Sequence, residues 1–137
     1  MTGSIKRSQA AQKGRIKSQD SSKGSTQALR PKFSFEKMAI SHGIAKCERE
    51  EKAALADTLG VLGQMTWAEI MQASRHGSGC EIIDRDIIKA PGKDRITPDC
   101  NILAFRFSAM KPMIGYRLDE TFYVVWLDRA MNVYDHG

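Results

Sequence analysis

The sequence of 137 residues predicts an α+β fold, in which a helical hairpin packs on a small, mostly antiparallel sheet. Two adjoining helical segments occupy the middle of the chain, and three runs of strand-forming residues follow close together after residue 101. We expect the strands to form a sheet of three or four. The two helices should cover one face of this sheet, because helices that precede a strand meander pack on one side of it. We place this α+β domain at residues 32–137, after a leader of residues 1–31.

The leader consists largely of Ser, Gln, Lys, Gly and Arg, which cannot bury enough apolar surface to fold, so it is predicted to be disordered. Residues 1–32 contain eight Lys and Arg against Asp20 alone, whereas residues 33–137 contain 13 basic and 15 acidic residues. The formal net charge of +5 therefore comes from the leader and gives no argument for a basic folded surface. The sequence leaves open whether the leader is functional or a mispredicted start.

The first half of the domain is predicted to contain one short strand and two helices. Lys32–Glu36 alternates apolar and polar residues, as a strand does. Cys47–Gln64 carries apolar residues at helical spacing, with glutamates in its first turn, where the helix dipole favours them. Thr66 and Glu69 match a capping box, which predicts a second helix starting at Trp67.

The second half is predicted to be a meander of strands. Glu81–Lys89 is rich in isoleucine and is expected to be a strand, and Ala90–Asp99 contains proline and glycine and is expected to be a loop. Ile102–Ser108 is the next strand. Met113–Leu118 and Phe122–Leu127 are expected to pair as a hairpin, with the second buried on both faces.

Several classes of protein are disfavoured by the sequence. The three cysteines are an odd number without paired spacing and no secretion signal precedes them, so reduced thiols and a cytoplasmic location are expected. No apolar run reaches the roughly 20 residues of a membrane helix, so no membrane partner is expected. No Cys-x-x-Cys knuckle is present, and neither a metal nor a cofactor is expected.

Polar groups on the predicted sheet are the candidate functional residues. Leu103, Phe105 and Phe107 share one face of their strand, which places Arg106 on the other. Cleavage of RNA by its own 2′-hydroxyl needs a base, cations on the phosphorane and an acid at the 5′-oxygen. Arginine suits the phosphate, because its planar fork matches phosphate oxygens, and Tyr or His can transfer protons.

Three segments resemble the RelE/ParE-like toxin superfamily, whose best-known members are messenger-RNA endonucleases: Ile114-Gly-Tyr-Arg117, the apolar strand Phe122–Leu127, and the closing Tyr134-Asp-His136. The resemblance covers about residues 33–137. It implies a RelE-like fold, a metal-independent messenger-RNA interferase activity, RNA as a substrate, either free or on the ribosome, and a protein antitoxin as partner. It also implies that a proton-transfer residue lies near the carboxyl end.

The sequence thus predicts the toxin of a toxin–antitoxin-like system, acting as a metal-independent RNA endonuclease. The candidate catalytic residues are Arg106, Arg117, Tyr134 and His136, and the candidate RNA-binding residues are Lys89, Lys93, Arg95 and Arg129. The alternative is a non-catalytic binding module, either a ParE-like inhibitor of another protein or an RNA- or ribosome-associated accessory protein that binds through the basic leader.

Overall fold

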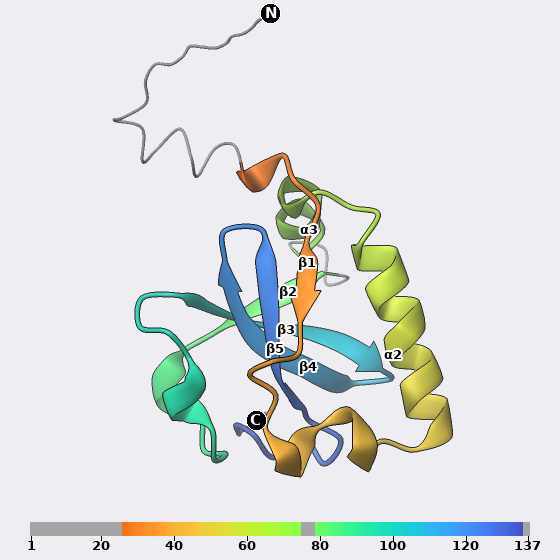
Figure 1. Ribbon diagram of the computed structural model, residues 1–137, viewed down its shortest axis with the longest axis vertical. Coiled ribbons are helices and arrows are strands. Elements are labelled where there is room, and N and C mark those ends of the chain that lie inside the picture. The colour runs from red at the N-terminus through yellow and green to blue at the C-terminus, as the bar shows by residue number, and fades with distance from the viewer. Residues whose placement is uncertain (1–25, 75–78, 136–137) are drawn as a thin grey trace, which may run out of the picture.

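The computed structural model describes residues 26–74 and 79–135, and its centre is a five-stranded mixed sheet (Figure 1). The strands are β1 (Lys32–Ser34), β2 (Cys80–Ile83), β3 (Asn101–Ser108), β4 (Lys111–Leu118) and β5 (Thr121–Leu127). Their order across the sheet is β1-β5-β4-β3-β2. All neighbours pair antiparallel except β1, which runs parallel to β5. The α+β class is confirmed, with five strands in place of the three or four expected.

Two helices, α2 (Arg49–Leu62) and α3 (Trp67–Ser74), start at carboxylates that accept backbone N–H groups. The Glu51 side chain accepts from the Glu48 backbone at 2.6 Å. At α3, the Thr66 N–H donates to the Glu69 carboxylate at 2.8 Å, and the Glu69 N–H donates back to the Thr66 hydroxyl at 3.2 Å. The capping box and the start of the second helix are therefore confirmed, because both orphan donors have partners.

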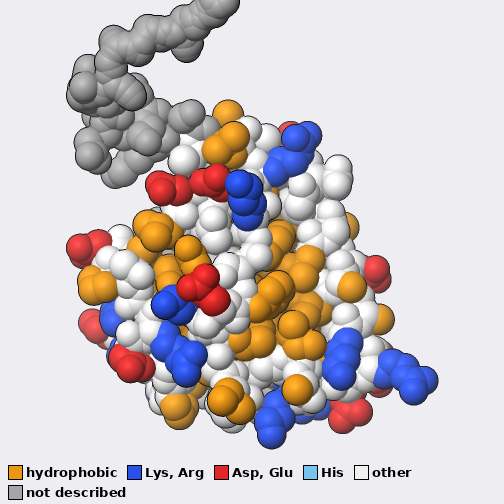
Figure 2. Space-filling view, in the orientation of Figure 1, with side chains coloured by type: hydrophobic (Ala, Val, Ile, Leu, Met, Phe, Trp, Pro, Cys, Tyr) orange, Lys and Arg blue, Asp and Glu red, His pale blue; other side chains and the backbone are white. Residues whose placement is uncertain are grey.

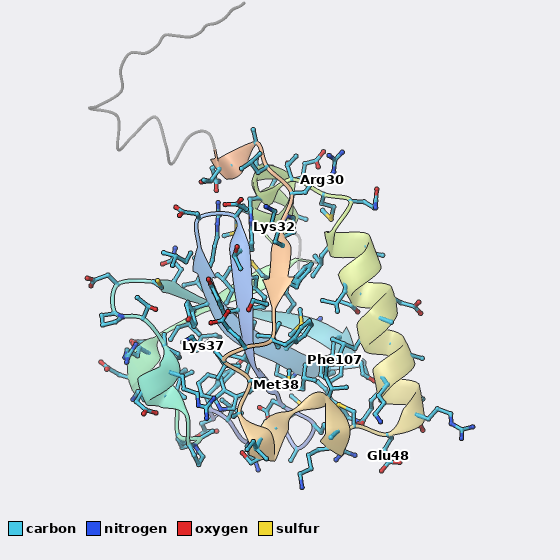
Figure 3. The ribbon with its side chains drawn as sticks, in the orientation of Figure 1. Arg30, Lys32, Lys37, Met38, Glu48 and Phe107 are labelled. Carbon is cyan, nitrogen blue, oxygen red and sulfur yellow. The ribbon has the colours of Figure 1, made fainter. Side chains whose placement is uncertain are left out.

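One face of the sheet, here called the helix face, packs against both helices. Leu55 from α2 and Trp67 from α3 join Phe105, Phe122 and Val124 of the strands in one buried cluster. Apolar side chains gather between β1 and α2, with Lys and Arg side chains around them (Figure 2). Met38 and Phe107 lie in this region (Figure 3).

The opposite face, here called the loop face, is covered by residues 84–100 and by the segment after β5. Ile88 and Ile96 of the loop pack with Ile114 and Trp126 of the strands. The indole N–H of Trp126 donates to the carbonyl of Pro91 at 2.9 Å, which anchors the middle of the loop. The sheet is thus buried on both sides, which explains why β5 is apolar on both of its faces.

The boundaries of two predicted segments differ from the structure. The strand expected at Glu81–Lys89 ends at Ile83, because the Asp84 carboxylate accepts the Asp86 N–H at 3.0 Å and starts a 3-10 turn. Residues 26–31, which the sequence analysis placed in the leader, contact the domain. The carbonyl of Leu29, for example, accepts the N–H of Trp67 at 2.9 Å.

Candidate active site

Glu81 and Arg106 lie on neighbouring strands and point to the loop face. Glu81 of β2 pairs with Ala104 of β3, and Arg106 follows two residues farther along β3. Because side chains alternate along a strand, Ala104 and Arg106 share a face, opposite to Phe105. Diagonal neighbours of this kind lie about 7–8 Å apart, so the carboxylate and the guanidinium can contact one ligand together.

Tyr134 is placed beside this pair by the segment that follows β5. The Asp128 carboxylate, which is fully buried, accepts the N–H of Asn132 at 2.9 Å and of Val133 at 3.0 Å. The Lys89 N–H then donates to the Val133 carbonyl at 2.7 Å. These bonds fix the backbone immediately before Tyr134.

The Tyr134 hydroxyl is a hydrogen-bond donor to Glu81. Burial, together with the carboxylates of Glu81 and Asp128 and the bond to Glu81, raises the pKa of Tyr134 to about 12. A phenol of that pKa stays protonated at neutral pH, so its hydrogen orients one oxygen of the Glu81 carboxylate. Tyr134 therefore acts here as a donor and not as a base.

Arg106, Glu81 and Tyr134 line one pocket of about 360 Å³, together with Met131 and Pro112. The volume lies within the range of roughly 300–1,000 Å³ that is typical of small-ligand sites. Arg106 is exposed and forms no hydrogen bond or ion pair with any described residue. Its charge is therefore available to a ligand.

The structure does not bring Arg117 to this pocket. Arg117 pairs with Asn101 and Phe122 and points to the helix face, where its guanidinium stacks on Trp67 with 4.2 Å to the ring centroid. Its Nε donates to the Asp119 carbonyl at 2.7 Å. Asn101 and Arg106 are five positions apart on β3, or about 17 Å. One phosphate therefore cannot contact both of these candidate catalytic arginines.

Arg129 contributes to the architecture of the fold. Its Nε donates to the Glu51 carboxylate, and Lys111 donates to the other Glu51 oxygen. The Glu51 side chain is only 3% exposed, whereas the side chains of Lys111 and Arg129 are 35% and 34% exposed. This ionic cluster joins the start of α2 to β4 and to the end of β5. It engages the guanidinium of Arg129, which we expected to bind RNA.

The remaining predicted residues lie apart from the pocket or outside the described residues. The exposed Arg95 donates to the carbonyl of Met38 at 3.3 Å, and the backbone carbonyl of Lys93 accepts from Arg85 at 3.3 Å; neither residue lines the pocket. Lys89 is exposed beside the segment that carries Tyr134. His136 lies outside the described residues.

Glu81 is the residue of this pocket that the sequence analysis missed. It lies in the run Cys-Glu-Ile-Ile, which we interpreted only as apolar strand. A signal was present, because a carboxylate within an apolar strand needs either solvent or a partner. The partner, Tyr134, is 53 positions away in the sequence, and no local pattern connects the two.

Comparison of the chain with protein-family models, with curated proteins and with solved structures gives no match. The RelE/ParE-like resemblance therefore remains a prediction. Within residues 26–74 and 79–135, no group of three or more His, Cys, Asp and Glu side chains is arranged to hold a metal ion. The helices described in those ranges are also too short or too polar to cross a membrane.

Proposed function

We propose that the chain is a metal-independent RNA endonuclease whose active site is the pocket of Glu81, Arg106 and Tyr134. The observation that supports the proposal is the position of Arg106. It is an exposed guanidinium without a partner among the described residues, diagonal to a carboxylate that a buried tyrosine orients. A guanidinium keeps its charge at physiological pH and can donate two parallel hydrogen bonds to two oxygens of one phosphate.

Each group has a role in the cleavage of RNA. Glu81 accepts the proton of the 2′-hydroxyl, whose oxygen attacks the adjacent phosphorus. Arg106 binds the phosphate oxygens and stabilises the charge of the phosphorane. The bond from phosphorus to the 5′-oxygen breaks, and Tyr134 donates its phenolic proton to that oxygen. Glu81 returns its proton through the hydrogen bond to Tyr134, so the products are a 2′,3′-cyclic phosphate and a free 5′-hydroxyl.

The wider biology remains part of the same proposal. A RelE-like fold, the role of a toxin, a protein antitoxin and a ribosome-bound substrate are implied by the resemblance. A cytoplasmic location is inferred from the odd number of unpaired cysteines. The site of Glu81 and Arg106 differs from the set of catalytic residues expected from the sequence, since Arg117 is engaged with Trp67. The proposed chemistry stands on the pocket alone.

The test is cleavage of a labelled single-stranded RNA by the full chain in the presence of a metal chelator. We expect products that end in 2′,3′-cyclic phosphate, and no cut where a 2′-deoxynucleotide replaces the one that carries the attacking hydroxyl. Arg106→Ala should slow cleavage by about 100- to 1,000-fold, as does the loss of one transition-state donor. Arg49→Ala is the matched control, because Arg49 is an exposed arginine at the start of α2, outside the pocket.

Intact RNA, both free with the chelator and bound to ribosomes without it, or equal rates for the wild type and Arg106→Ala, would overturn the proposal. Binding of RNA without cleavage would instead favour the non-catalytic module. In that case the salt dependence of binding by the wild type and by a variant without residues 1–25 would show whether the basic leader is responsible.

A further inference from the structure

A second pocket adjoins the candidate active site on the other side of Arg106. It has a volume of about 370 Å³ and lies on the helix face, where Asp57, Thr58, Val61 and Leu62 of α2 form one wall. Gly79, Phe105 and Arg106 line both pockets. β3 ends beside α2 (Figure 1), so the second pocket adds residues of α2 to this shared lining, whereas the candidate active site adds Glu81 and Tyr134.

The second pocket combines an apolar wall with groups that accept hydrogen bonds. Val61 is 62% exposed and lies beside Leu62 and Phe105, which gives a flat aromatic ring an apolar surface to contact. Asp57 is exposed, and no hydrogen bond or ion pair joins its carboxylate to a described residue. The Thr58 hydroxyl donates to the Phe107 carbonyl at 3.3 Å, so its remaining capacity toward a ligand is as an acceptor.

We infer that this pocket binds a guanine next to the phosphate held by Arg106, with Asp57 as the residue that selects the base. The inference rests on the proposed function, since it names the RNA that the same site prefers. A carboxylate is an acceptor with two oxygens and is satisfied by two adjacent donors. The Watson–Crick edge of guanine offers N1–H and N2–H side by side, and single-stranded RNA exposes this edge to proteins.

The other bases fit the pocket less well. Adenine and cytosine each present one amino group beside a ring nitrogen that is itself an acceptor and repels the carboxylate. Uracil presents a single N–H between two carbonyl oxygens. The negative charge of Asp57 repels the phosphates of any RNA and weakens its binding. Among the four bases, only guanine offsets this repulsion, because it donates two hydrogen bonds to the carboxylate.

The test measures binding of the full chain to short oligoribonucleotides that contain 2′-deoxyribose at the cleavage position. The central base is guanine, adenine, cytosine, uracil or hypoxanthine, and hypoxanthine lacks the 2-amino group of guanine. We expect guanine to bind roughly 5- to 150-fold more tightly than adenine, as one bidentate base contact does. Hypoxanthine should fall between them, because it keeps N1–H.

Asp57→Asn should remove the preference for guanine, because an amide offers one acceptor in place of two. Glu50→Gln is the matched control, since it removes an exposed carboxylate from the same helix outside both pockets and should keep the preference. Equal affinity for all bases in the wild type, or an undiminished preference in Asp57→Asn, would overturn the inference.

The two proposals fail in different ways. If RNA is cleaved with dependence on Arg106 but without preference for guanine, the base pocket is wrong and the endonuclease stands. If no oligonucleotide is bound or cut, both are wrong. Circular dichroism of each variant separates a lost contact from a lost fold.

Discussion

Replacing Glu51 with Gln tests the buried ionic cluster that joins α2 to the ends of β4 and β5. The change keeps the size of the side chain and removes the charge that Lys111 and Arg129 share. Hydrogen bonds from Lys111, from the Glu48 backbone and from Arg129 lower the pKa of Glu51 from 4.5 to about 2. A carboxyl whose pKa falls this far on folding contributes about 3 kcal/mol of folding free energy.

The expected loss at neutral pH is about 2–3 kcal/mol. Breaking a fully buried pair costs about 3–5 kcal/mol, but Lys111 and Arg129 are each about one third exposed, and solvent screens part of the interaction. Urea unfolding of the wild type and of Glu51→Gln measures the difference. Glu50→Gln, on the exposed side of the same turn, should change the free energy of unfolding by no more than about 0.5 kcal/mol.

The pH dependence gives a second check. Because folding lowers the pKa of Glu51, its contribution is complete above the unfolded value of 4.5 and is lost as the pH falls toward about 2. The gap between the wild type and Glu51→Gln should therefore close across this window. A gap below about 0.5 kcal/mol at neutral pH, or one that stays constant on acidification, would refute the reasoning.

Three further variants test the sheet and α2. Arg117→Ala should lower the free energy of unfolding by about 1 kcal/mol, because it removes the stacking on Trp67, and should slow RNA cleavage far less than Arg106→Ala does. If Arg117→Ala slowed cleavage as much as Arg106→Ala does, Arg117 would belong to the active site after all. Gly115→Ala should cost about 3 kcal/mol or more in thermal or urea unfolding, because its Cβ would lie 1.9 Å from the Tyr123 carbonyl oxygen. Gly60→Ala, with open space around its Cβ, should instead stabilise α2 by about 0.5 kcal/mol, and the opposite order of the two variants would contradict the packing described.

Sequence reasoning succeeded where the determinants are local. The capping box at Thr66 and Glu69 and the alternation of Leu103, Phe105 and Phe107 each depend on residues within one turn or one strand. The hairpin of β4 and β5 was also found, because its two apolar runs flank a short turn.

The parts that were missed depend on register and on long-range contacts. Alternation within β3 and β4 fixes the faces of Arg106 and Arg117 only relative to their own strands. The pairing of Asn101 with Arg117 decides that the two arginines point to opposite faces. The bond between Tyr134 and Glu81 likewise requires the path of the chain after β5, which the buried Asp128 determines.

The parallel pairing of β1 with β5 has a consequence for the order in which the protein can form. Phe33, near the amino end of the domain, pairs with Phe122, and their rings pack edge to face with 6.3 Å between the ring centroids. Contacts between residues so distant in sequence form late, because a long loop must close before they contribute. A nascent chain that stops before β5 lacks both the strand that joins β1 to the rest of the sheet and the segment that carries Tyr134. Synthesis itself thus delays the proposed activity, and incomplete chains should be harmless to the cell's RNA but prone to aggregation.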